Sequence, residues 1–129
     1  MPRGVETLEQ TVAREVGPDG IAKMVSAFYQ KVQKDDLIGP MYPDGDWEGS
    51  EERLRDFLKF RLLGDPTYTF KRGHPRLRMR HAGFSIGEAE RDRWVELMDG
   101  AMKETKVPEG ARVKLVEFFA QVADFMRNQ

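Results

Sequence analysis

The chain has 129 residues with 21 basic and 22 acidic side chains, and its net charge of -1 argues against a general nucleic-acid or membrane binder. It contains no cysteine, which excludes disulfide bonds, iron–sulfur clusters and thiol catalysis. No apolar run is long enough to cross a membrane, and the N-terminus lacks the hydrophobic region of a signal peptide. We therefore expect a cytoplasmic protein with a single domain over residues 1–129.

Two helices are predicted in the first third of the chain. Residues 7–16 have a short amphipathic pattern, which Gly17-Pro18-Asp19-Gly20 interrupts with two glycines and a proline. Asp19 is placed to cap a second helix, and Tyr29 lies at the edge of that helix's apolar face. The apolar residues with helical spacing are Ile21, Met24, Val25, Phe28 and Val32.

A loop rich in proline and glycine is predicted over residues 37–49. Residues 44–49 match four positions of a calcium-binding loop, but Arg55 stands where that loop needs a bidentate glutamate. Calcium binding is therefore not expected. A third helix is predicted from Ser50, and Gly64-Asp65-Pro66 closes it.

Two longer helices are predicted in the last third of the chain. Ser85 and Glu88 form a capping-box pattern at the start of the first, which is expected to stop before Val107. The second starts at about Pro108 and has a strong period of 3.6 residues up to Met126. Because no stretch alternates as a strand does, the predicted fold class is all-α.

The stretch 71–84 contains both histidines and a run of basic residues. If a helix begins near Pro75, then Leu77, His81 and Phe84 share one face, with arginines on its flanks. An imidazole there can ligate a metal through one nitrogen, and the arginines can bind anionic groups. The alternative reading is a core histidine with a satisfied hydrogen bond beside a solvated arginine face.

The residue inventory leaves few kinds of chemistry open. The chain has no Gly-rich phosphate loop after a strand and no His-Glu-x-x-His motif. A helical domain with one histidine on an apolar face suits a cofactor held between helices, and haem is the clearest candidate. Haem offers a large apolar surface, an axial position for an imidazole and two propionates for arginines.

Several segments of the chain closely resemble those of the second group of truncated haemoglobins. The resemblance rests on the run from Arg72 to His81 together with Phe84, and on residues 90–94. It extends back through Phe28-Tyr29, the segment 41–43 and residues 51–58, and covers about residues 15 to 126. It implies a two-over-two helical sandwich that carries haem b, the iron complex of protoporphyrin IX.

The resemblance also implies roles for individual residues. His81 matches the proximal histidine that ligates the iron, while Tyr29, Tyr42 and Trp94 match the polar residues on the opposite, distal side. Two phenols and an indole are hydrogen-bond donors that can hold bound dioxygen, because phenols stay protonated well above neutral pH. Taken singly, each of the three aromatic residues is more often an ordinary core residue whose polar tip bonds to the backbone, and it is their joint agreement with the family pattern that favours the distal role.

Further cofactor contacts are predicted around these residues. Ser50 falls at the position that gates ligand entry, so we expect a short path to solvent there. Arg78, Arg72 and Tyr68 are the candidates for the haem propionates. The remaining candidates for contact with haem are Leu54, Phe57, Leu58, Met79, Phe84, Trp94, Leu97 and Met98.

The sequence therefore predicts a haem protein that binds dioxygen, nitric oxide, carbon monoxide or peroxide at a pentacoordinate iron. Nitric oxide dioxygenase or peroxidase activity is compatible with such a pocket and needs an external reductase, while oxygen transport is less favoured because strong donors slow release. A monomer or homodimer is expected. The alternatives are a cofactor-free helical interaction domain and a weak nucleic-acid binder that uses residues 71–80.

Overall fold

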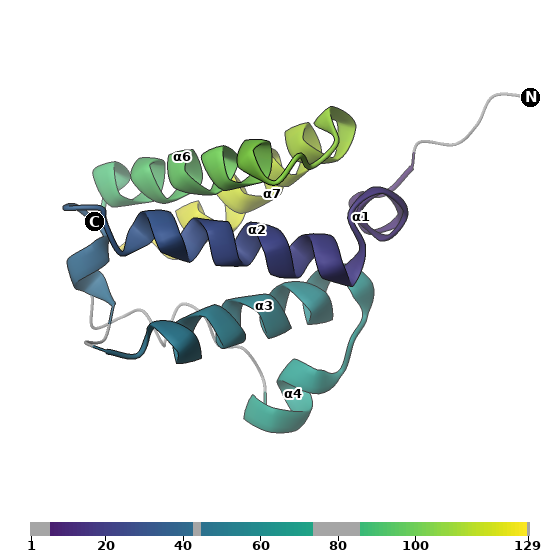
Figure 1. Cartoon of the computed structure of the whole chain (residues 1–129), viewed down its shortest axis with the longest axis horizontal. Coiled ribbons are helices and arrows are strands. Elements are labelled where there is room, and N and C mark those ends of the chain that lie inside the picture. Colours follow the sequence, from purple (N-terminus) through teal and green to yellow (C-terminus); the bar gives the residue numbers. More distant parts are fainter. Residues whose placement is uncertain (1–5, 43–44, 74–85, 129) are drawn as a thin grey trace, which may run out of the picture.

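The computed structural model of the chain describes residues 6–42, 45–73 and 86–128, and this part consists of helices and connecting turns without a strand (Figure 1). The α-helices are α1 (Leu8–Glu15), α2 (Gly17–Val32), α3 (Trp47–Leu63), α4 (Thr67–Arg72), α6 (Glu88–Glu104) and α7 (Glu109–Phe125), and the turn η1 (Gly39–Met41) is a 3-10 helix. The predicted all-α fold class is confirmed. None of the described helices is long and apolar enough to cross a membrane.

The long helices form two packed pairs. Helix α2 lies against α3, α6 lies against α7, and the two pairs meet where α2 packs on α6 (Figure 1). This arrangement is the expected two-over-two helical sandwich. The short helix α1 bridges the pairs, because it contacts both α3 and α7.

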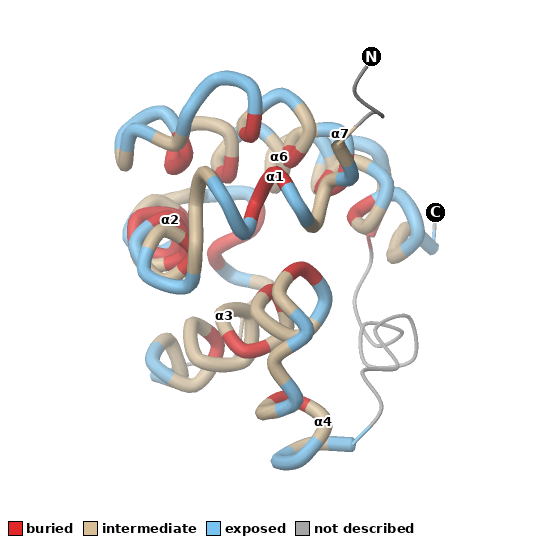
Figure 2. Tube along the Cα trace, turned by 90° about the vertical axis from the view of Figure 1, so that its right-hand side faces the viewer, coloured by how far each residue is buried: buried red, intermediate tan, exposed pale blue. Residues whose placement is uncertain are grey.

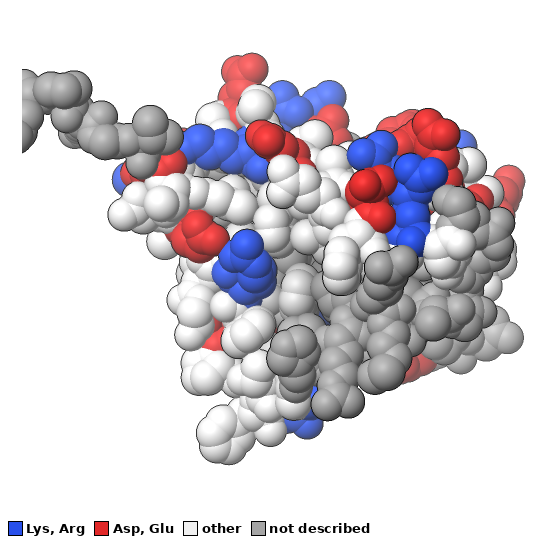
Figure 3. Space-filling view, turned by 180° about the vertical axis from the view of Figure 1, so that it is seen from behind, with Lys and Arg blue, Asp and Glu red and all other residues white. Residues whose placement is uncertain are grey.

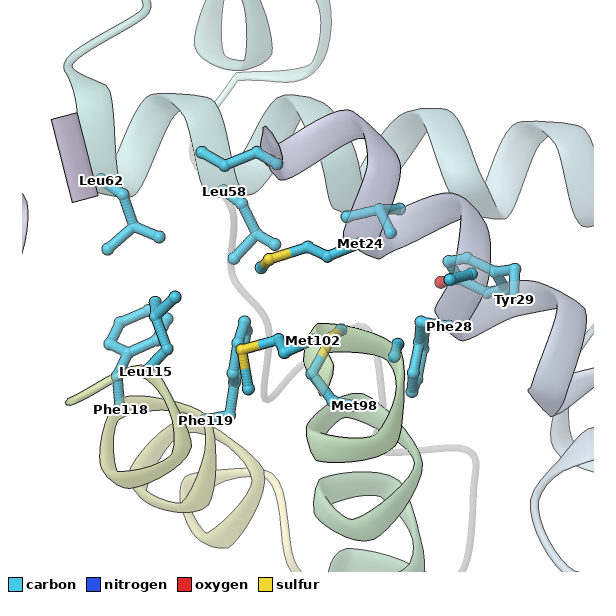
Figure 4. Close-up of a cluster of buried hydrophobic side chains, with 14 of the residues drawn as sticks. Met24, Phe28, Tyr29, Leu58, Leu62, Met98, Met102, Leu115, Phe118 and Phe119 are labelled. Carbon is cyan, nitrogen blue, oxygen red and sulfur yellow. The ribbon is translucent and has the colours of Figure 1, made fainter. Parts of the chain in front are cut away.

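The core lies between the two pairs, and its largest members point inward from α2, α3, α6 and α7 (Figure 4). All five residues of the predicted apolar face of α2, from Ile21 to Val32, are fully buried. Figure 2 shows the same separation for the other helices, whose buried residues face the interior. Burial of such side chains contributes about 1.5–3 kcal/mol each, and this is the main driving force for the sandwich.

Three predicted helix starts are wrong in position. Helix α2 begins at Gly17, so Asp19 lies within its first turn and does not cap it. Helix α3 begins at Trp47, which is earlier than the predicted Ser50. Helix α6 begins at Glu88, and its capping carboxylate is that of Glu90, which accepts a hydrogen bond from the Gly87 N–H at 2.7 Å. In each case the helix follows a residue whose side chain makes no capping hydrogen bond, which is Val16, Asp46 or Gly87.

Helix α4 was not predicted, although its surroundings explain it. Gly64 adopts a left-handed conformation with φ 72° and ends α3, as the glycine at that position predicted. Asp65 then accepts hydrogen bonds from both the backbone N–H and the hydroxyl of Thr67, at 2.9 and 2.6 Å, and so starts the next turn. The helix lies on the outer side of α3 (Figure 2) and carries Tyr68 toward the interior, where this residue is buried.

Candidate functional site

A cavity of about 340 Å³ lies between the two helix pairs. This volume is within the range of small-molecule and cofactor sites. Its walls are mainly apolar and come from α3, α6, α7 and the segment around η1, with Tyr29 from α2 and Tyr68 from α4. The predicted site residues that line it are Tyr29, Tyr42, Ser50, Leu54, Phe57, Leu58, Tyr68 and Trp94.

The three predicted distal residues come together at one end of the cavity. Tyr29 belongs to α2, Tyr42 follows η1, and Trp94 belongs to α6. The rings of Tyr29 and Tyr42 lie 5.6 Å apart between centroids and nearly perpendicular, at 85°. The Tyr42 hydroxyl lies close enough to the Tyr29 hydroxyl and to the Trp94 indole N–H to interact with both, and each of these neighbours lowers the pKa of Tyr42.

Burial keeps both phenols protonated. Burial raises the pKa of Tyr29 well above its usual range, and its hydrogen bond to Tyr42 adds to the effect because the proton is held between the two oxygens. Burial also raises the pKa of Tyr42. Both neighbours act on the pKa of Tyr42 as donors would, so we infer that the Tyr42 proton is left for a further acceptor in the cavity.

Helix α3 forms the wall beside these aromatic residues. Ser50, Leu54, Phe57 and Leu58 follow helical spacing and line the cavity together, as the sequence predicted. Ser50 is buried, and its hydroxyl accepts a hydrogen bond from Arg53 at 3.2 Å. Its predicted role as a gate for ligand entry stays a prediction.

The sequence matches the model of the bacterial-like globin family over residues 14–128. The chain belongs to this family, in its second group of truncated haemoglobins.

Known relatives agree in sequence and in fold. A solved haemoglobin of Chloroflexus aurantiacus is 39% identical, with a TM-score of 0.85, and the match covers 92% of this chain and 98% of that one. A truncated oxygen-avid haemoglobin of Bacillus subtilis is 30% identical with a TM-score of 0.83, over 90% of this chain and 98% of that one. A curated group 2 truncated haemoglobin of Bacillus subtilis is 34% identical over 87 residues, 67% of this globin, and the match spans 65% of that relative's own length.

The globin family implies a haem group, and the cavity of this globin fits one. Its walls are apolar and aromatic, as the body of the cofactor requires. Two cationic side chains, Arg53 and Arg91, also reach the lining, and Arg91 has a buried Nε that finds no hydrogen-bond partner among the described residues. Cationic groups at the edge of an apolar cavity suit a ligand with an apolar body and carboxylates.

Several predicted cofactor contacts of this globin lie elsewhere. Arg72 stacks over the Tyr68 ring at 5.5 Å and pairs with Asp56 at 3.1 Å, and it is not among the residues that line the cavity. Leu97 packs at the edge of the core and Met98 is fully buried within it, both outside the lining formed by the described residues. The predictions for His81, Arg78, Met79 and Phe84 lie outside the described residues.

Some lining residues of the globin were not singled out from its sequence. Helix α7 and the residue that follows it supply the largest group, which is Phe118, Phe119, Val122, Ala123 and Met126. Their period of 3.6 residues had predicted a buried face, but periodicity does not separate core from cavity wall. Trp47, a neighbour of the distal cluster outside the cavity lining formed by the described residues, was also missed: its ring lies 5.4 Å from that of Tyr42 between centroids, tilted by 36°, and the sequence had placed it in a loop.

Proposed function

We propose that this globin holds haem b through His81 and binds dioxygen and similar diatomic ligands with the sixth coordination position otherwise open. When bound, the haem supplies the iron that coordinates the ligand. The residues of the chain supply the rest of the site: an apolar cavity that excludes water, and hydrogen-bond donors from Tyr29, Tyr42 and Trp94. The oxygen-avid relative from Bacillus subtilis supports this proposal.

The observation that carries the proposal is the meeting of three polar aromatic residues, Tyr29, Tyr42 and Trp94, at one end of the apolar cavity. In the proposed site Tyr42 accepts from Tyr29 and Trp94, so its own proton can be donated to a ligand that carries partial negative charge. Hydrogen bonds in such a chain polarise one another, which strengthens the terminal donor. The burial of Tyr29 within an apolar region increases the effect further.

The visible spectrum tests the proposal directly. The purified protein should show a sharp Soret band in the ferric, ferrous and carbon monoxide forms. His81→Gly should lose or shift that band, and added imidazole should restore it because it replaces the missing ligand. A protein that stays colourless when given haem, or a His81→Gly variant with an unchanged spectrum, would contradict the proposal.

A site that retains dioxygen also favours its use as an oxidant over its transport. We propose that nitric oxide oxidation to nitrate is the first reaction to test, with peroxide-dependent oxidation as the second. The first reaction would leave the iron ferric and so needs an external reductase or reductant to restore the ferrous form, whereas the second would start from the ferric protein and take its electrons from the substrate that is oxidised. Stoichiometric nitrate from the oxygenated protein and nitric oxide would support this activity, and its slowing in Tyr42→Phe would connect the activity to the distal donors.

The two rival functions have less support. A cofactor-free interaction domain does not account for a cavity with three convergent polar aromatic residues. For nucleic-acid binding, Lys71 and Arg72 would have to be available, but both pair with Glu52 and Asp56. On the described part of the face in Figure 3, basic and acidic side chains lie next to one another. The single domain over residues 1–129, the cytoplasmic location and the monomer or homodimer stay predictions.

A further inference from the structure

A nearly buried carboxylate, Asp35, lies just beyond the C-terminal end of α2. One of its oxygens accepts hydrogen bonds from the backbone N–H groups of Leu37 and Ile38, at 3.1 and 2.9 Å. The other oxygen accepts from the guanidinium of Arg93 on α6 at 2.7 Å, and the Asp35 side chain is only 7% exposed. The Ile38 N–H, followed by Arg93, lowers the pKa of Asp35 although burial opposes this, so the group is ionised at neutral pH.

The segment that Asp35 caps leads directly to the distal site. Ile38 and Met41 line the cavity, and Tyr42 follows them. The Asp35 carbonyl accepts from the Gly39 N–H at 3.1 Å, and the Gly39 carbonyl accepts from the Tyr42 N–H at 3.2 Å. The position of Tyr42 is thus set through a short series of hydrogen bonds that begins at Asp35.

This segment also lies tightly against α2. A Cβ atom added to Gly39 would come within 2.7 Å of the Val32 carbonyl oxygen, so residue 39 must be glycine for the backbone to approach this closely. A tight turn of this kind has little freedom to adjust. A displacement at Asp35 is therefore expected to reach Tyr42.

Helix α6 and the segment 35–42 are joined at two places, by the Asp35–Arg93 ion pair and again at the distal site. Arg93, which binds Asp35, directly precedes Trp94, whose indole donates to Tyr42. The Asp35–Arg93 ion pair and the Trp94–Tyr42 hydrogen bond therefore link α6 to the same segment, one at each end of it. A charged hydrogen bond is stronger than a neutral one, so the ion pair determines the spacing in which the neutral bond forms.

We propose that Asp35 is a positioning residue that, through Arg93, holds the segment 35–42 so that the Trp94 indole reaches the Tyr42 hydroxyl. Loss of Asp35 then weakens that bond and speeds the release of dioxygen. The effect on dioxygen rests on the proposed function, whereas the effect on the Trp94 indole does not.

The experiment uses the haem-loaded, carbon monoxide-bound ferrous protein and three variants. Asp35→Asn keeps an oxygen that can cap Ile38 but removes the charge that binds Arg93. Arg93→Met removes the ion pair and leaves the cap untouched, so it tests the same link if Asp35→Asn folds poorly. Glu104→Gln is the control, because it breaks an ion pair between α2 and α6, Lys31–Glu104 at 3.0 Å, at the far end of α6 from Trp94.

The first measurement is hydrogen exchange of the Trp94 indole N–H, read by nitrogen-15 NMR and assigned with Trp94→Phe. We expect exchange to be faster in Asp35→Asn and in Arg93→Met, and unchanged in Glu104→Gln. The second is the dioxygen dissociation rate, which should rise roughly fivefold in the same two variants, the effect of losing one typical hydrogen bond. In a Trp94→Phe background, Asp35→Asn should add nothing to that rate.

The outcomes separate the two proposals. Unchanged indole exchange in both Asp35→Asn and Arg93→Met would overturn the positioning role, as would the same acceleration in Glu104→Gln. A full effect of Asp35→Asn on dioxygen release in the Trp94→Phe background would overturn it too. Faster indole exchange in a protein that fails to bind dioxygen would support the positioning role and overturn the proposed function.

Discussion

At the scale of the residue, Tyr42 is the centre of the distal network. In the proposed site it accepts from Tyr29 and Trp94 and donates its own proton to the bound ligand. We predict that Tyr42→Phe raises the dioxygen dissociation rate at least about fivefold, since one lost hydrogen bond of about 1 kcal/mol has that effect. Carbon monoxide release should change much less, because bound carbon monoxide is a poorer acceptor.

Stopped-flow displacement of dioxygen measures the dissociation rate and so tests this prediction. Phe60→Leu is a suitable control. Phe60 is a partly buried aromatic residue of α3 that stacks on Tyr68 and does not line the cavity. A dioxygen dissociation rate in Tyr42→Phe that equals that of the unmodified protein would contradict the role of Tyr42.

The buried phenol of Tyr29 also makes stability depend on alkaline pH. Burial raises its pKa in the folded protein, while the unfolded chain keeps a tyrosine pKa near 10. The contribution to stability is therefore complete below about pH 10 and decreases as pH rises above it, because only the unfolded chain releases the proton. We predict that the free energy of unfolding falls between about pH 9.5 and 11 and falls less steeply in Tyr29→Phe. Denaturant titrations over this range measure it, and equal slopes would count against the prediction.

The sequence predicted the three polar aromatic residues of the distal site, but it did not predict the charged residue beside them. Tyr29, Tyr42 and Trp94 were predicted because their kind and order resemble a known family, and the structure brings them together. Arg53 was not predicted, because a charged residue on a helix usually faces water. Here it bonds to Ser50 and Asp46 at the rim of the cavity. Only the three-dimensional packing shows that the turn of α3 that contains Arg53 lies beside the cavity.

At the scale of the element, the attachment of α4 to α3 is the clearest case of a buried ion pair. Asp56 is buried on α3 and binds Arg72 of α4 at 3.1 Å, with Lys71 at 3.6 Å. We predict that Asp56→Ala lowers the free energy of unfolding by about 3 kcal/mol, because two cations then lose a partly buried partner. Denaturant unfolding measures the loss.

Glu52→Gln provides the matched control for this prediction. Glu52 binds the same two cations, Lys71 at 3.1 Å and Arg72 at 3.3 Å, but it is more exposed than Asp56. Solvent screening makes such pairs weak, so little change in stability is expected. If the two variants lost equal stability, burial of the ion pair would not be what holds α4 in place.

The helix boundaries show why sequence reading finds elements more readily than their ends. The apolar period of α2 and α7 predicted both helices, because burial of one face decides whether they form. The starts of α3 and α6 were misplaced, since Trp47 and Glu88 follow residues without a side-chain cap. Helix α4 has only six residues, too few for a period to be visible. Its stability comes from contacts with α3 that the sequence does not display.

At the scale of the whole molecule, the core and the cavity share the space between the two helix pairs. Leu58, Phe118 and Phe119 belong to both, since they are buried core side chains (Figure 4) and also line the cavity. The cavity is therefore a continuation of the core, and its apolar wall comes from the same helix faces whose burial brings the pairs together. The two-over-two arrangement therefore creates the site as a direct result of how the pairs meet.

Two hydrogen bonds join the residues after α7 to the residues before α6. The Asn128 side-chain oxygen accepts from the Ile86 N–H at 2.9 Å, and the Asn128 N–H donates to the Ile86 carbonyl at 2.9 Å. Ile86 lines the cavity and stands five residues after His81 in the sequence. This reciprocal pair thus connects the end of α7 to the chain that enters α6.

We predict that Asn128→Ala makes the loaded globin lose haem a few times faster, because a nearly buried N–H at Ile86 then lacks its acceptor and this corner of the cavity loosens. Haem transfer to an excess of a haem-accepting apoglobin, followed at the Soret band, measures the rate. Gln121→Ala, an exposed change on α7, is the control and should leave the rate unaltered. Equal rates in Asn128→Ala and the unmodified protein would show that the end of the chain has no part in holding the cofactor.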